Sequence, residues 1–116
     1  MAVRLQGDWQ ELDVQTCAAV GGHLGVYQLG TGGGTIVFIG VADARTRFGL
    51  RGELLRHCAD PPTGATRFRV EVTHSYRSRY MELVEAYLHD HGRFPIGNAD
   101  LDRSRFGTLR PGGGPA

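Results

Sequence analysis

The sequence contains no lysine and only two cysteines, Cys17 and Cys58, and it lacks a long hydrophobic run. No apolar stretch approaches the roughly 18 residues that a membrane-spanning helix needs, so we expect no transmembrane segment. The first ten residues also lack the apolar stretch of a secretory signal peptide. Two cysteines without a CxxC spacing do not make a disulfide framework. Together these absences favour a reduced, cytoplasmic setting.

Motifs for nucleotide, zinc and serine chemistry are absent too. The glycine-rich stretch 30–34 lacks the Gly-Lys-Ser/Thr of a phosphate-binding loop, and an apolar run follows it rather than a helical pattern. None of the five histidines belongs to an HExxH pair. No serine lies in the GxSxG setting of a serine hydrolase. We therefore expect no P-loop, zinc centre or serine nucleophile.

The composition is that of a small globular domain. The chain has 116 residues, of which 41% are hydrophobic and 22% are charged. A chain of this length buries enough surface for one modest core. We divide it into an N-terminal extension (1–23), a folded domain (24–102) and a flexible Gly/Pro-rich tail (103–116).

Charge is distributed unevenly along the chain. The formal net charge is +1, yet residues 44–80 hold eight arginines and three acids, a local charge of +5. A guanidinium group pairs with a phosphate through two parallel hydrogen bonds, so this segment is a candidate surface for a polyanion. The alternative is an ordinary solvated basic face.

Three segments have the pattern of β-strands. Residues 25–29 are rich in extended-favouring side chains, and 35–39 form a continuous apolar run typical of a strand covered on both faces. The glycines between them predict a hairpin loop. Residues 67–72 alternate apolar and charged side chains, which predicts a half-buried strand.

Two helices are expected after the hairpin. The first, about 45–58, is weakened by Gly49 and Gly52, because each glycine costs a helix roughly 1 kcal/mol relative to alanine. The second, about 77–91, has a continuous apolar stripe, and Gly92 is a typical helix stop. The order predicts an α+β fold with a small, three-stranded, mostly antiparallel sheet flanked by helices.

The chain resembles the GIY-YIG nuclease superfamily. The residues that carry the resemblance are Gly25-Val26-Tyr27 on the first strand and Phe38-Ile39-Gly40 at the end of the second. The basic helix, the third strand and a helix carrying Glu85 follow in the family's order. Asn98 comes thirteen residues after Glu85, as a late asparagine does in that family. The similarity spans about residues 24–100.

The resemblance implies metal-assisted hydrolysis of phosphodiester bonds in DNA, less readily RNA. Tyr27 would act on the attacking water, and Arg51 would stabilise the charge that develops on the phosphate. Glu85 would bind one Mg²⁺ or Mn²⁺ ion, a hard cation that prefers carboxylate and water oxygens. His57 and Asn98 complete the implied catalytic set.

Two residues depart from the family pattern. Phe38 stands where a second tyrosine is usual, and an alignment anchored on His57 places Glu53 where the catalytic arginine is expected. No separate DNA-binding domain is attached, so targeting would rest on the basic segment. Two alternatives therefore remain open: a catalytically inactive module that binds nucleic acid or protein, and a pocket repurposed for a small molecule.

Overall fold

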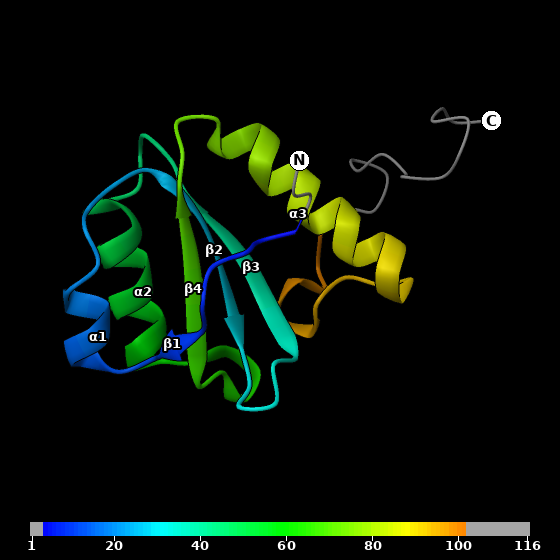
Figure 1. The fold of residues 1–116 in the computed structure, drawn as a ribbon, viewed down its shortest axis with the longest axis horizontal. Helices are drawn as coiled ribbons and strands as arrows, with labels where there is room; N and C mark the ends of the chain where they lie inside the picture. The colour runs from blue at the N-terminus through cyan, green and yellow to red at the C-terminus, as the bar shows by residue number, and fades with distance from the viewer. Residues whose placement is uncertain (1–3, 102–116) are drawn as a thin grey trace.

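Four antiparallel strands form one sheet in the order β1-β4-β2-β3 in the computed structural model, which describes residues 4–101 (Figure 1). The strands are β1 (Gln10–Glu11), β2 (Gly25–Gly30), β3 (Ile36–Ala42) and β4 (Arg67–Val72). The helices are α1 (Val14–Ala18), α2 (Gly49–Ala59) and α3 (Tyr76–His91). The predicted α+β class is confirmed. The sheet has one strand more than expected, because residues 10–11 pair with β4.

The β2–β3 hairpin forms the centre and one edge of the sheet. Its glycine-rich loop is closed by hydrogen bonds between Thr31 and Thr35 and between Gly34 and Thr31, and Gly34 adopts φ +88°. That conformation strains any residue with a Cβ, which explains a glycine there. The register changes beside Gly30, where Val37 is bulged out of the pairing.

The helices cover opposite faces of the sheet (Figure 1). Alternate strand residues, including Tyr27, Leu29 and Phe68, pack with α1 and α2. The intervening residues, such as Val26 and Ile39, pack with Leu83, Val84 and Tyr87 of α3. The sheet is therefore buried on both sides, as the apolar run in β3 predicted.

Helix α2 begins later than the sequence predicts, at Gly49 instead of residue 45. Phe48 and Gly49 have φ of +63° and +59°, so the chain reverses its handedness immediately before the helix. Ahead of it, Asp43 and Thr46 close a turn through their side chains. Such local bonds compete with helix formation and set the later start. Helix α3 ends at Gly92 as predicted, with φ +74°.

Residues before β2 belong to the same packed unit. Leu5 is buried against α3, and Cys17 of α1 is buried against α2. Cys17 and Cys58 are both free thiols, and burial raises the pKa of Cys17 to about 12. The predicted tail 103–116 lies outside the described residues. None of the helices within residues 4–101 is long and apolar enough to cross a bilayer.

Candidate functional site

Tyr27 of β2 is the centre of a polar cluster between the sheet and α2. Its side chain is 1% exposed and faces α2. Gly40 is its partner in the register with β3, and a Cβ at Gly40 would lie 2.7 Å from Cε1 of the Tyr27 ring. The ring therefore lies directly over Gly40, in space that the side chain of any other residue at position 40 would occupy.

The Tyr27 hydroxyl is held by two residues of α2. It donates a hydrogen bond to Oε1 of Glu53 at 2.8 Å, and it lies 2.8 Å from Nε2 of His57. Glu53 and His57 are four residues apart and so share one face of the helix. Arg56 forms a salt bridge to Glu53 at 2.9 Å from the exposed side of the cluster. The carboxylate thus joins a buried phenol to an exposed guanidinium.

Phe38 covers the cluster on the β3 side. Its ring centroid lies 5.0 Å from that of His57 and 6.0 Å from that of Tyr27. These separations are typical of packed aromatic pairs. Phe38 provides an apolar wall and no hydroxyl, so the polar groups of the cluster come from β2 and α2.

The surroundings hold Tyr27 and His57 in their neutral forms. Burial, with a smaller contribution from the neighbouring Glu53 carboxylate, raises the pKa of Tyr27 far above the usual value of a phenol. Burial lowers the pKa of His57, and the Arg56 guanidinium lowers it further. A phenol that keeps its proton donates a hydrogen bond and does not accept a proton from water.

The other residues expected at the site do not take part in this cluster's hydrogen bonds. Arg51 lies about 200° around α2 from Glu53, since each residue turns the helix by about 100°. A Cβ at Gly22 would lie 3.6 Å from its guanidinium, so Arg51 is beside the loop before β2. Glu85 belongs to α3, which packs on the opposite face of the sheet. Its role as a metal ligand stays a prediction.

Asn98 binds the main chain of β3. Its Oδ1 accepts a hydrogen bond from the Ile39 N–H at 2.8 Å, and its Nδ2 donates one to the Ile39 carbonyl at 3.0 Å. The side chain is buried in the 3-10 turn Ile96–Asn98 and takes the place of a neighbouring strand, because β3 is an edge strand of the sheet within residues 4–101. This contact explains Asn98 without a catalytic role.

The comparison with known families gives one match. The family described as a domain of unknown function (DUF7508) matches residues 3–90, which is most of the chain. The chain belongs to this family. No curated protein and no solved structure shows a significant match.

In this DUF7508 domain the structure brings together two of the residues predicted from the sequence, Tyr27 and His57. The sequence indicates Glu53 only as a departure from the family pattern, and it does not distinguish Arg56 from the other arginines of the basic segment. The spacing Glu53, Arg56, His57 is the signal that could have found them, because positions three and four apart are neighbours on a helix. Within residues 4–101, no three His, Cys, Asp or Glu side chains gather closely enough to hold a metal ion.

The buried phenol of the DUF7508 domain predicts a specific response to alkaline pH. In the unfolded chain Tyr27 ionises near pH 10, whereas its pKa in the folded chain is far higher. Above about pH 10 the unfolded state therefore loses a proton that the folded state keeps, and stability falls by about 1.4 kcal/mol per pH unit from this group. The free energy of unfolding, measured with urea at a series of pH values between 9 and 12, should therefore fall less steeply with pH in Tyr27→Phe than in the wild type. Above about pH 10 the two slopes should differ by that amount. Parallel slopes for the two proteins would contradict the buried, neutral phenol.

Proposed function

We propose that this DUF7508 domain is a non-catalytic module with a GIY-YIG-like fold that binds DNA through the arginines around the start of α2. The observation that carries the proposal is the surface formed by Arg45, Arg47, Phe48 and Arg51, which we call the α2 entry. Three arginines and an exposed aromatic ring lie there within seven residues. This combination suits a phosphate backbone and the bases attached to it.

The state of Tyr27 supports binding over catalysis. Its hydroxyl donates to Glu53, and its pKa is raised, so it is not available as a base at neutral pH. Glu53 places a negative charge where the resemblance implies a phosphate-binding arginine. A carboxylate at that position repels a phosphate instead of stabilising it. Hydrolysis with Mg²⁺ or Mn²⁺ remains the competing prediction.

The arginines of the α2 entry are free to bind an external anion. Among the described residues, the side chains of Arg45, Arg47 and Arg51 form no hydrogen bond or salt bridge. By contrast, five other described arginines bond an acid or an amide side chain: Arg4, Arg56, Arg67, Arg69 and Arg79. Within residues 4–101, Arg77 and Arg93 also lack such a bond, but neither has a second unpaired described arginine close by in sequence.

Phe48 is exposed by a strained backbone. Phe48 is 61% exposed, and φ of +63° is a conformation that a bulky residue rarely adopts. The Arg47 guanidinium lies over the ring, 5.2 Å from the centroid. Strain of this kind is typical of functional positions. In this proposal Phe48 stacks on an unpaired base, and the arginines bind the flanking phosphates.

Binding is tested by fluorescence anisotropy with a labelled single-stranded DNA oligonucleotide over a series of salt concentrations. We expect the affinity to fall steeply with salt, because phosphate contacts release counterions. Arg47→Gln and Arg51→Gln should each reduce the slope of log K against log salt by about one. Phe48→Ala should weaken binding at every salt concentration and leave the slope unchanged.

The matched control for the arginine variants is Arg77→Gln, which removes an exposed charge at the other end of the sequence segment that carries the +5 charge. It should leave the slope unchanged. Equal effects at Arg77 and Arg47 would mean that only net charge matters and would contradict DNA binding at the α2 entry.

Plasmid nicking with Mg²⁺ or Mn²⁺ tests the competing prediction, since cleavage abolished by Tyr27→Phe and Glu85→Ala would establish a nuclease. As part of the proposal we place the domain in the cytoplasm, where free thiols persist.

A further inference from the structure

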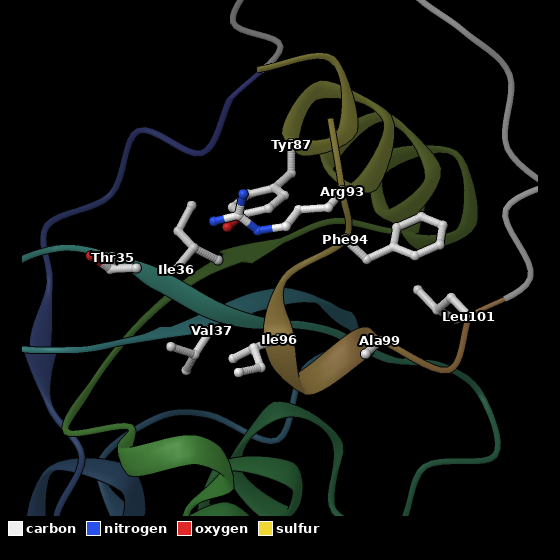
Figure 2. Close-up of a pocket in the computed structure, with 9 residues that line it drawn as sticks. All are labelled: Thr35, Ile36, Val37, Tyr87, Arg93, Phe94, Ile96, Ala99 and Leu101. Atoms are coloured by element: carbon white, nitrogen blue, oxygen red, sulfur yellow. The ribbon is translucent and has the colours of Figure 1, made fainter. Parts of the chain in front are cut away.

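A cavity of about 670 Å³ lies on the opposite side of the fold from the α2 entry, between β3 and the chain that follows α3 (Figure 2). Its walls come from the start of β3, from Tyr87 near the end of α3, and from residues 93–101. A volume of this size is in the range of small-molecule sites. Nothing in the Tyr27 cluster or the α2 entry uses it.

The lining is apolar apart from a few polar groups. Side chains of Ile36, Val37, Phe94, Ile96 and Leu101 form most of it, and the described lining includes no acid. Ile96 is 65% exposed although it is a large hydrophobic residue. An exposed aliphatic side chain at the rim of an apolar cavity favours an apolar occupant.

Two polar groups of the lining, the Tyr87 hydroxyl and the Arg93 guanidinium, form no hydrogen bond within residues 4–101. Tyr87 is only 8% exposed and its ring centroid lies 4.1 Å from that of His91, but its hydroxyl is not fully buried and forms no hydrogen bond there. The Arg93 guanidinium forms neither a hydrogen bond nor a salt bridge with another described residue, and Figure 2 shows its side chain extending across the cavity toward Ile36. A phenol O–H and a guanidinium are both hydrogen-bond donors, and they line the same cavity.

We propose that this cavity binds a small amphipathic carboxylate, with its apolar body in the cavity and its carboxylate on Arg93 and Tyr87. A carboxylate accepts two parallel hydrogen bonds from a guanidinium and retains lone pairs for a phenol. The aliphatic and aromatic walls bury the hydrocarbon part and gain free energy in proportion to the apolar area removed from water. The charge of Arg93, with no acid in the described lining to neutralise it, selects an anion over a neutral molecule of the same shape.

Two probes of the same body test the head group separately: 4-phenylbutyrate and 4-phenylbutan-1-ol. Titration of the full ¹⁵N-labelled chain by NMR should give saturable shifts for amides of residues 35–37 and 93–101 with both probes. The carboxylate should bind about tenfold more tightly, because a hydrogen bond to a charged group is stronger than a neutral one. Absence of saturable shifts, or shifts confined to the α2 entry, would overturn the proposal.

Variants then separate the two parts of the site. Arg93→Gln should lower the affinity for 4-phenylbutyrate about tenfold, to that of the alcohol, while the affinity for the alcohol stays unchanged. Ala99 is an exposed residue of the cavity wall, so Ala99→Trp should fill the cavity and weaken the binding of both probes equally. The control Arg77→Gln should change neither. If Arg93→Gln lowered the affinity for both probes equally, Arg93 would not bind the carboxylate specifically, and the proposed head-group site would be wrong. The DNA titration is independent of these outcomes.

Discussion

Gly40→Ala is expected to destabilise the domain by about 3 kcal/mol, one of the two largest effects that the structure predicts. The new Cβ would lie 2.7 Å from Cε1 of Tyr27 and closer still to Cζ and Oη. The ring cannot move away, because it is 1% exposed and its hydroxyl is held by Glu53 and His57. Either those bonds break or β3 moves away from β2. Urea unfolding at pH 7 measures the loss.

Gly32→Ala is the matched control for this substitution. A Cβ at Gly32 would meet no atom of residues 4–101 within 4 Å, and its backbone is not in the left-handed region. The same chemical change should therefore alter stability by less than about 0.5 kcal/mol. A second measurement removes the Tyr27 ring that the new Cβ would meet. In a Tyr27→Val background, Gly40→Ala should lose most of its effect on the free energy of unfolding. Equal effects of Gly40→Ala in both backgrounds would show that the ring does not occupy the space above Gly40.

Asn98→Ala is expected to destabilise the domain by about 2–4 kcal/mol. The substitution leaves the N–H and the carbonyl of Ile39, a residue with 0% exposure, without their partners. Each buried, unsatisfied polar group costs about 1–3 kcal/mol. Thermal and urea unfolding measure the loss. It should appear equally in the presence and absence of DNA, because Asn98 supports the edge of the sheet and not the α2 entry.

Asn98→Asp distinguishes hydrogen bonding from loss of volume. The aspartate oxygen can still accept from the Ile39 N–H, but the second oxygen would face the Ile39 carbonyl and repel it while the group is ionised. Repulsion raises the pKa of the introduced carboxyl in the folded state, so its stability deficit should shrink as pH falls through that raised value. Asn98→Ala has no such group, and its deficit should not change in this way. The same pH dependence in both variants would contradict the paired contact.

The sequence determined the parts of the fold that depend on local pattern. Strands β2, β3 and β4 were predicted from apolar runs and alternation, and α3 from an apolar stripe that ends at Gly92. Helix α1 and strand β1 were missed because five and two residues are too short to show a period. The start of α2 was placed too early, since the left-handed Phe48 has no signature in the local sequence.

The candidate site likewise contains residues that the sequence indicates and residues that only the structure brings to it. Tyr27 and His57 could be selected from sequence, and the structure brings their side chains within hydrogen-bond distance. Glu53 and Arg56 enter the cluster because of their position around α2, which a list of residue types does not reveal. Arg51 is separated from Glu53 by rotation around the same helix, and Glu85 lies on a helix that packs on the opposite face of the sheet.

By itself the sequence determined an α+β domain, the order of its main strands and helices, and a concentration of arginine in its middle third. Those properties follow from periodicity and composition, which act over a few neighbouring residues. Only the tertiary structure decided that a glutamate holds the buried phenol and that Asn98 completes the edge of β3. It also decided that Arg93 and Tyr87 share a cavity. Each of these depends on residues brought together from distant parts of the chain by packing on the two faces of one sheet.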